Sequence, residues 1–333
     1  MSRIAILGGG SWGTSLAILF SRNREGHQIA LWVHDAELAR AMRDKRENAT
    51  YLPGQTLGPA VSVHSEIAAA IDGAEIVVGA MPSAHARQVY RAAATALPGN
   101  VTIVSATKGL EPASQARMSE VIAQVIPPQA AKIAVLSGPS FALEAARGEP
   151  TAVVLACEDE ATAKMLQEKL GGPTLRLYTN SDVLGVELAA AMKNVIAIAA
   201  GACQGLGLGA NTLAALITRG LAEMTRLAVA LGAKQETLSG LAGLGDLVLT
   251  CTGALSRNRH VGLELGKGRL PKEILTGMKM VAEGVGTAPA LLRLARESHI
   301  ELPITEQVNA ILHESKAPAA AIREIMDRPQ KRE

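Results

Sequence analysis

Three glycines separate a short apolar segment from an apolar helical segment at the start of the chain. Residues Ile4–Leu7 run directly into the pattern Gly8-x-Gly10-x-x-Gly13. Gly8 would permit a tight turn, Gly10 would let a pyrophosphate approach the backbone, and Gly13 would let the next helix lie close to the strand. The free N–H groups and the positive dipole end of that helix would face the phosphates. The pattern predicts a nicotinamide or flavin dinucleotide site; a glycine-rich turn without a ligand is the alternative.

The type of cofactor depends on the end of the second predicted strand. About 20 residues after the glycines, an acidic side chain would hold the ribose 2′-hydroxyl of NAD, whereas a cation would accept the 2′-phosphate of NADP. Val33 occupies the expected acidic position, His34 can donate to a phosphate, and Asp35 can instead cap the next helix. These residues favour NADP, or both cofactors, over strict use of NAD; two solvated turn residues are the alternative.

Three turns follow predicted strands at the edge where open α/β sheets bind ligands. They are Met81–Ser83, Thr107–Gly109 and Gly138–Ala142. Lys108, in the second turn, would place a cation beside the nicotinamide, where it can meet an anionic or carbonyl-bearing substrate. A lysine in an isolated loop is more often solvated, but here three such turns coincide.

Two charged residues in the second half have apolar surroundings. Lys193 has apolar residues at all four positions three and four residues away along its predicted helix. It therefore either extends its charged end to the helix edge or enters a site, where it can transfer a proton. Asn194 beside it can orient a polar partner. Asp246 lies among small and apolar residues in the segment Ala242–Leu247.

The segment Ser256-Arg257-Asn258 combines a hydroxyl, a guanidinium and an amide. This combination suits a phosphate, because Arg binds through paired N–H groups while Ser and Asn add neutral donors. A helix N-cap followed by solvated charges would give the same sequence. Further along, Glu283 is an isolated carboxylate in an apolar, glycine-flanked turn, with solvation as the alternative to a site.

Predicted strands and helices, which must position these residues, alternate in the first half of the chain. Continuous Ile, Val and Ala strands separated by helices indicate a Rossmann-like, doubly wound α/β fold, with a mostly parallel sheet covered on both faces. The expected strands are Arg3–Leu7, Gln28–Val33, Val61–Val63, Glu75–Ala80, Val101–Ala106, Lys132–Ser137, Thr151–Ala156 and Thr174–Tyr178. The expected helices include Thr14–Ser21, Ala36–Arg43, His85–Ala96, Ser114–Val125 and Glu160–Leu170.

After Tyr178 only helical patterns follow. We therefore expect a dinucleotide-binding domain over residues 1–182 and a helical substrate-binding and catalytic domain over residues 183–333. Its expected helices are Val183–Gln204, Thr212–Leu231, Lys234–Ala242, Asn258–Leu265, Pro271–Thr276, Ala288–Glu297, Ile304–His313 and Ala319–Met326. The stretch Gly205–Gly209 is expected to cap the first helix rather than form a second phosphate loop, because no strand precedes it.

The composition is that of a globular protein with a sizeable core. The 333 residues are 48% hydrophobic and 19% charged, with a net charge of +2. Binding to nucleic acid or a membrane surface therefore has little electrostatic support. Cys157, Cys203 and Cys251 are widely spaced, which indicates buried free thiols rather than a disulfide or metal site. With no signal peptide, and with charges inside the apolar stretch Val186–Ala202, we expect a cytoplasmic protein that is not inserted in a membrane.

Seven motifs, in order, span almost the whole chain. They are Gly8–Thr14, Ala106–Leu110, Ser137–Ala142, Lys193–Ala197, Gly220–Met224, Gly243–Leu247 and Ser256–Arg259, and Leu302–Glu306 also fits. Together they closely resemble the bacterial NAD(P)-dependent sn-glycerol-3-phosphate dehydrogenases. Many members of that family carry Arg where this chain has His34, so the preference between NAD and NADP stays open.

The resemblance implies a role for each matching residue. The implied NAD(P)H contacts are Gly8, Gly10, Ser11, Trp12, Gly13, His34, Lys108, Ala142, Arg257, Val281 and Glu283. The implied substrate contacts are Lys108, Gly138, Ser140, Lys193, Asp246, Ser256, Arg257 and Asn258, of which the last three would hold the phosphate. The implied catalytic residues are Lys193, as proton donor or acceptor, with Lys108 and Asp246. No metal is expected, because the lysine cation stabilises the developing oxyanion.

The implied reaction is reversible hydride transfer between the nicotinamide and C2 of glycerol 3-phosphate. The family further implies a homodimer and a supply of glycerol 3-phosphate for phospholipid synthesis. One alternative is a related dehydrogenase of another anionic hydroxy substrate, because charge alone does not distinguish phosphate from carboxylate. The other is a non-catalytic dinucleotide sensor, against which the presence of Lys193 argues.

Overall fold

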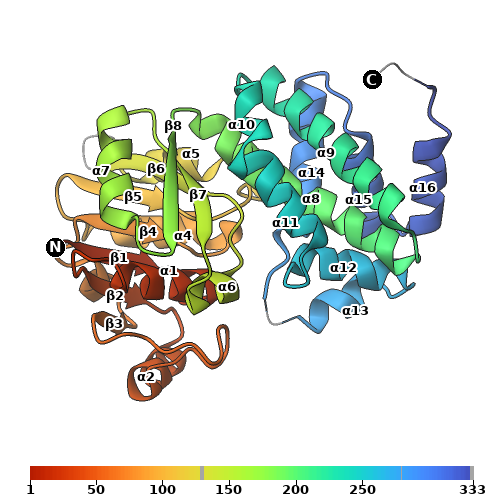
Figure 1. The fold of residues 1–333 in the computed structure, drawn as a ribbon. Coiled ribbons are helices and arrows are strands. Elements are labelled where there is room, and N and C mark those ends of the chain that lie inside the picture. Colours follow the sequence, from red (N-terminus) through yellow and green to blue (C-terminus); the bar gives the residue numbers. More distant parts are fainter. Residues whose placement is uncertain (128–130, 279, 331–333) are drawn as a thin grey trace. The chain divides into compact units, whose positions relative to one another are not determined.

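The computed structural model describes residues 1–127, 131–278 and 280–330. The chain divides into two compact units, Met1–Glu187 and Leu188–Glu333. In Figure 1 the strands of the first unit are coloured from red to yellow-green, and the described part of the second unit consists of helices coloured green to blue. A Rossmann-like α/β unit followed by a helical unit is the fold that the sequence predicts.

The eight strands of the described residues form one sheet, as predicted. Its order is β3-β2-β1-β4-β5-β6-β7-β8. Every hydrogen-bonded pair is parallel except β6 with β7, so the sheet is mostly parallel. The strands are β1 (Arg3–Leu7), β2 (Gln28–Trp32), β3 (Val61–His64), β4 (Ile76–Gly79), β5 (Val101–Ser105), β6 (Ala131–Ser137), β7 (Thr151–Ala156) and β8 (Leu175–Asn180).

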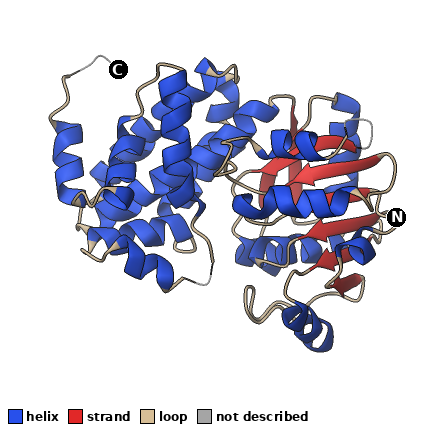
Figure 2. Ribbon diagram, turned by 180° about the vertical axis from the view of Figure 1, so that it is seen from behind, coloured by secondary structure: helices blue, strands red, loops and turns tan. Residues whose placement is uncertain are grey.

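Helices cover both faces of the sheet (Figure 2). Residues Ile4 and Ile6 of β1 pack in one buried cluster with residues of α1, α2, α6 and α7, whereas Ala5 and Leu7 pack in another with α3, α4 and α5. This alternation along one strand is the property of a doubly wound fold. The helices are α1 (Ser11–Ser21), α2 (Ala36–Lys45), α3 (Ile67–Ile71), α4 (Ser83–Ala94), α5 (Met118–Val125), α6 (Ala142–Arg147) and α7 (Glu160–Leu170).

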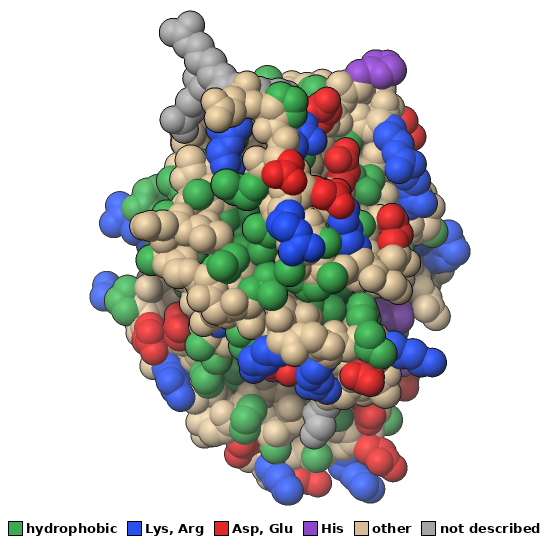
Figure 3. Space-filling model, turned by 90° about the vertical axis from the view of Figure 1, so that its right-hand side faces the viewer, with side chains coloured by type: hydrophobic (Ala, Val, Ile, Leu, Met, Phe, Trp, Pro, Cys, Tyr) green, Lys and Arg blue, Asp and Glu red, His purple; other side chains and the backbone are tan. Residues whose placement is uncertain are grey.

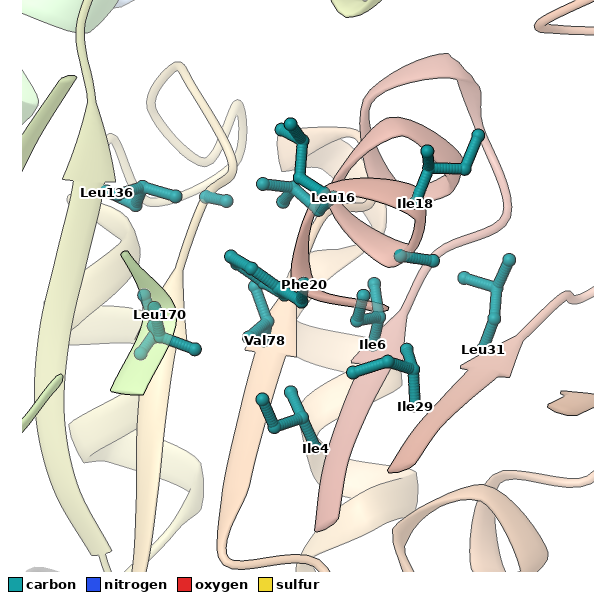
Figure 4. Close-up of a cluster of buried hydrophobic side chains, with 14 of the residues drawn as sticks. Ile4, Ile6, Leu16, Ile18, Phe20, Ile29, Leu31, Val78, Leu136 and Leu170 are labelled. Atoms are coloured by element: carbon teal, nitrogen blue, oxygen red, sulfur yellow. The ribbon is translucent and has the colours of Figure 1, made fainter. Parts of the chain in front are cut away.

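Burial of large apolar side chains holds α1 on the sheet. Figure 4 shows Leu16 and Phe20 of α1 beside Ile6 of β1 and Val78 of β4, and all four side chains are buried. Complete burial of such a side chain contributes about 1.5–3 kcal/mol. The helix that follows the glycine turn is therefore fixed over the centre of the sheet.

The local predictions for the first unit need three corrections. The short helices α3 and α6 were not predicted. The predicted start of the Ser114–Val125 helix was wrong, because α5 begins at Met118. The residues before it form a turn instead, in which Glu111 N–H donates to Ala116 O at 2.9 Å and the Ser114 hydroxyl donates to the Glu111 carboxylate.

In the second unit, α8 is the central apolar helix. It is long and apolar enough to cross a membrane, but 89% of its most apolar 18-residue window is buried inside the protein, as in the core helix of a soluble protein. The elements are α8 (Val183–Gly205), α9 (Ala210–Ala230), α10 (Gln235–Ser239), a π-helical turn η1 (Leu241–Gly245), α11 (Asp246–Thr252), α12 (Arg257–Gly266), α13 (Pro271–Thr276), α14 (Glu283–Glu297), α15 (Pro303–His313) and α16 (Pro318–Met326).

Two helix predictions in this unit had wrong bounds. The helix predicted over Lys234–Ala242 ends at Ser239, before Gly240, as α10, and η1 and α11 follow where the prediction had no further helix. The helix predicted from Ala288 begins at Glu283, which therefore lies in a helix and not in a turn. This helix continues through Pro289, and His313 Nε2 lies 3.2 Å from Val285 O, the carbonyl that Pro289 leaves without its helical donor.

The glycine-rich stretch after α8 is a helix cap, as predicted. Gly207 has a φ of +77°, and its N–H donates to Gln204 O. Leu208 N–H donates to Cys203 O at 3.0 Å. These two bonds satisfy carbonyls at the helix end and form a Schellman motif.

Candidate active site

The glycine turn has the geometry that a pyrophosphate site requires. Gly8 has a φ of +130°, and a Cβ at Gly13 would lie 1.9 Å from Gly8 O, so both positions require glycine. At Gly10, in contrast, a Cβ would have no atom of the described residues within 4 Å. Gly10 immediately precedes α1 and has no side chain to cap its first N–H groups. These residues therefore fit a phosphate group bound at the helix N-terminus.

Two exposed residues after β2 have different environments. Asp35 is the N-cap of α2, because its Oδ1 accepts from Leu38 N–H at 2.9 Å. His34 is exposed, and its ring meets the Trp32 ring edge-on at a centroid distance of 5.8 Å. The Asp35 carboxylate is therefore held at the start of α2, in the capping role that the sequence analysis gave as one possibility.

Turns after β4, β5 and β6 are linked to one another. The Thr107 hydroxyl donates to Met81 O at 2.8 Å. Lys108 Nζ donates to Gly138 O at 2.9 Å and lies 3.4 Å from Ser140 Oγ, and Ser140 Oγ also donates to Gly138 O. The structure thus brings Lys108, Gly138 and Ser140 into one cluster. Ala142 begins the short helix that follows.

An ion pair that the sequence did not reveal supports the Lys108 turn. Arg87 of α4 makes two bonds of 2.7 Å to the Glu111 carboxylate, through Nε and Nη2. These bonds hold the pKa of Glu111 below its usual range. Glu111 is buried three residues after Lys108, so the bidentate pair ties the Lys108 turn to α4.

Lys193 is buried and paired, rather than extended to the edge of its helix. It is 5% exposed, and its Nζ lies 2.6 Å from Oδ1 of Asp246, which is 1% exposed. Lys193 Nζ also donates to Thr250 Oγ1 at 2.9 Å, and that hydroxyl donates to Asp246 O at 2.5 Å. Sequence reasoning missed Thr250, one turn after Asp246 on α11, because the residues 246–252 were not predicted to be helical.

Glycines bring α8 and α12 into backbone contact. A Cβ at Gly201 would lie 1.9 Å from Arg259 O, and a Cβ at Gly262 would lie 1.9 Å from Ile198 O. The same spacing recurs one turn later, so each helix carries a Gly-x-x-x-Gly pattern at the crossing, Gly201–Gly205 and Gly262–Gly266. These two patterns were a sequence signal for the contact.

This crossing places the start of α12 beside Asn194. Asn258 Nδ2 donates to Asn194 Oδ1, and Asn258 Oδ1 accepts from Gly284 N–H, both at 3.0 Å. Ser256 is the N-cap of α12 and accepts from Arg259 N–H at 3.2 Å. This is the capping role that the sequence analysis gave as an alternative. The predicted trio is therefore gathered next to the helix that carries Lys193.

Arg257 lies at an open pocket of the second unit. The pocket has a volume of about 280 Å³, and Arg257 Nη1 donates to Val281 O at 2.7 Å. Glu283, the first residue of α14, comes two residues after Val281 in the chain. The pocket is lined by Ala254, Leu255, Ser256, Arg257, His260, Met278 and Met280. A guanidinium, an imidazole and a hydroxyl around one pocket suit an anionic ligand, and sequence reasoning missed His260.

Two of the shared motifs have a structural explanation. The buried Glu223 carboxylate accepts from the N–H groups of Ile304 and Thr305 at 2.8 and 3.0 Å, and from the Thr305 hydroxyl at 2.7 Å. It thereby caps the start of α15. A Cβ at Gly220 would lie 2.6 Å from Ile196 Cγ2, so this glycine permits close packing against α8. Both motifs therefore hold helices together.

The described cysteine, histidine and acidic side chains form no candidate metal centre. Cys157, Cys203 and Cys251 are buried free thiols, as predicted. In the parts of the chain that the structure describes, no group of three or more His, Cys, Asp or Glu side chains has a metal-binding arrangement. On the face shown in Figure 3, Lys and Arg side chains alternate with Asp and Glu.

Comparison with known proteins decides the family. The family model for the N-terminus of NAD-dependent glycerol-3-phosphate dehydrogenase matches residues 3–163, and the model for its C-terminus matches residues 182–323. The chain belongs to this family.

Relatives of similar length agree with this assignment. The chain is 51% identical over 331 residues to glycerol-3-phosphate dehydrogenase (NAD(P)+) of Koribacter versatilis, covering 99% of this chain and 98% of the relative. It is 52% identical to the enzyme of the same name from Acidobacterium capsulatum, covering 99% of each. The crystal structure of glycerol-3-phosphate dehydrogenase from Coxiella burnetii is 41% identical, with a TM-score of 0.93, and covers 98% of this chain and 99% of that one. The glycerol-3-phosphate dehydrogenase fold therefore extends over both units.

Proposed function

We propose that this protein catalyses the reversible NAD(P)-dependent oxidoreduction of sn-glycerol 3-phosphate and dihydroxyacetone phosphate. The observation that carries the proposal is the buried ion pair between Lys193 and Asp246, in a chain of the glycerol-3-phosphate dehydrogenase family. Lys193 lies on α8, which packs against α12. A paired lysine supplies the proton transfer that the reaction needs, and Ser256 and Arg257 supply donors for the phosphate.

The first unit holds the cofactor. Gly8, Gly10 and Gly13 form the turn for the pyrophosphate, and Ser11 and Trp12 contribute N–H groups at the start of α1. When bound, the nicotinamide supplies or accepts the hydride. The other proposed cofactor contacts are His34, Lys108, Ala142, Arg257, Val281 and Glu283.

Lys193 moves the proton. In the synthetic direction its ammonium donates a proton to the oxygen that develops on the substrate, and in the other direction its amine accepts that proton. Asp246 balances the lysine charge in the buried site, and Thr250 fixes the Nζ position between the two side chains. No further cation is required at this oxygen, because the ammonium itself stabilises the negative charge.

Binding energy comes from groups away from the reacting carbon. Arg257, Ser256 and Asn258 would hold the phosphate and orient the carbonyl, and Lys108, Gly138 and Ser140 are further proposed substrate contacts. Asn258 already bonds to Asn194 and Gly284, so it also keeps the phosphate site aligned with α8.

The cellular context follows from the activity. We propose a cytoplasmic homodimer that is not inserted in a membrane and supplies glycerol 3-phosphate for phospholipid synthesis. Residues 1–182 would form the dinucleotide-binding domain, and residues 183–333 the helical substrate-binding and catalytic domain. Because Val33 occupies the position of the acidic residue that would repel a 2′-phosphate, and His34 beside it can donate to that phosphate, NADPH should be accepted at least as well as NADH.

An absorbance assay at 340 nm tests the proposal. Purified protein is mixed with dihydroxyacetone phosphate and either NADH or NADPH, and consumption of the reduced cofactor is expected. Activity only with a carboxylate-bearing 2-oxo substrate would favour the related dehydrogenase. Cofactor binding without turnover of either substrate type would favour the sensor.

A further inference from the structure

A buried asparagine outside the seven motifs named above holds the glycine turn. Asn48 lies in the segment between α2 and β3 and is 0% exposed. Its Nδ2 donates to Gly9 O at 2.8 Å and to Thr14 Oγ1 at 2.8 Å. Its Oδ1 accepts from Tyr51 N–H at 3.1 Å. The carboxamide therefore joins the middle of the glycine turn to the first turn of α1.

The bond to Gly9 sets the direction of the next N–H group. The Gly9 carbonyl and the Gly10 N–H belong to one trans peptide plane and point in opposite directions. Because Asn48 holds the Gly9 oxygen inward, the Gly10 N–H is directed away from Asn48. A Cβ added at Gly10 would meet no described atom within 4 Å other than those of its chain neighbours, so the space beside the Gly10 Cα is open.

The opposite side of Gly9 is closed. A Cβ at Gly9 would lie 2.6 Å from Val33 Cγ2, so Gly9 is held between Val33 and Asn48. Thr14, which accepts the second Asn48 bond, also donates its backbone N–H to Gly10 O at 3.0 Å. The orientation of the Gly9–Gly10 peptide is therefore fixed from both ends before any ligand binds.

We infer that Asn48 is a positioning residue for the pyrophosphate of the dinucleotide: it preorganises the Gly10 N–H as a phosphate donor. The inference rests on the proposed function, since it assumes a dinucleotide at the glycine turn. It predicts that loss of the carboxamide weakens binding of ligands with a pyrophosphate and spares ligands that share only the nucleoside.

The experiment compares ADP with adenosine in wild type and Asn48→Ala, with dissociation constants from NMR titration, and measures the KM for NADH and kcat. We expect Asn48→Ala to weaken ADP at least tenfold and adenosine less than twofold. The KM for NADH should rise, while kcat at saturating NADH should stay within about threefold. Thr14→Val keeps the side-chain shape and removes the second acceptor of Asn48, so it should weaken ADP binding two- to fivefold. This variant provides the test if Asn48→Ala does not fold.

Asn23→Ala is the matched control. Asn23 is also buried, and its Nδ2 donates to two backbone carbonyls, those of Lys169 and Gly171, but it lies beyond the opposite end of α1. Its loss should lower the melting temperature and leave the ratio of the ADP and adenosine constants unchanged. Equal weakening of both ligands in the Asn48 or Thr14 variant, or no weakening, would overturn the inference. Absence of ADP and NADH binding in wild type would overturn the proposed function itself.

Discussion

The two units assemble their candidate site residues in different ways. In the first, the residues follow β1, β2, β5 and β6, which together with β4 are consecutive in the sheet, so the sheet topology alone gathers them at one edge. In the second, Lys193, Asp246 and Arg257 come from three helices. Lys193 and Asp246 meet in an ion pair between α8 and α11. Glycines let α8 and α12 pack with their backbones in contact, and Asn258, next to Arg257, there bonds to Asn194.

The candidate residues of the first unit therefore lie in separate turns, whereas those of the second unit depend on how its helices pack. A substitution in one turn of the first unit should affect mainly the ligand group nearest to that turn. A substitution at the helix crossing of the second unit should affect every residue that the crossing aligns. Four changes test this contrast, from the largest expected effect to the smallest.

Lys193→Ala should remove the chemistry of the second unit and leave cofactor binding in the first intact. We expect kcat to fall at least ~100-fold, the lower range for a general acid–base group. Steady-state kinetics and NADH titration measure the two effects. Lys267→Ala, which removes an exposed lysine of the same unit, is the control. Retention of more than about a third of the wild-type kcat would contradict the assigned role.

Arg257→Ala should act mainly through the substrate phosphate. Loss of a charged phosphate contact should cost about 2–4 kcal/mol in kcat/KM for dihydroxyacetone phosphate. Unphosphorylated dihydroxyacetone should lose little activity in the same variant, because it lacks the partner group. Arg259→Ala, on the same helix but outside the pocket lining, is the control. Equal losses with both substrates would place Arg257 outside the phosphate site.

Gly262→Ala should separate α8 from α12. The added Cβ would lie 1.9 Å from Ile198 O, which is backbone, so the helices must move apart. We expect a loss of about 1–3 kcal/mol in the free energy of unfolding, as for overpacking, together with a lower kcat/KM. Gly286→Ala is the control, since its Cβ would meet no described atom within 4 Å in α14, and it should be neutral or slightly stabilising. Similar melting temperatures for the two variants would disprove the backbone contact.

Glu111→Gln should weaken the first unit in a pH-dependent way. Arg87 lowers the folded-state pKa of Glu111 below the usual 4.5, so the pair stabilises the fold above that pH, and this stability is lost as the pH falls through the lowered pKa. We expect the variant to be about 1–3 kcal/mol less stable at pH 7 and the gap to shrink below about pH 4.5. Denaturant unfolding from pH 7 to pH 3.5 measures it, with the exposed Glu160→Gln as control. A gap that stays constant with pH would exclude the ion pair as its cause.

The sequence correctly predicted features that depend on residues close together along the chain. The eight strands follow from runs of Ile, Val and Ala, and the cap after α8 follows from Gly207, which adopts a positive φ. The helical state of Asp246–Thr252 did not follow, since three glycines precede it and packing decides its conformation. The start of α14 at Glu283 did not follow either, because Pro289 lies inside this helix and a distant residue, His313, approaches the carbonyl that Pro289 leaves exposed.

By itself, the sequence determined the order of the strands and of the longer helices, the glycine turn, and the residue types at each candidate contact, because these depend on local periodicity and local backbone sterics. Only the tertiary structure decided which polar groups meet. Asn48 reaches Gly9 across 39 residues, and Lys193 reaches Thr250 across 57. Such contacts depend on how strands and helices pack, and a buried polar group has to find its partner wherever packing places one.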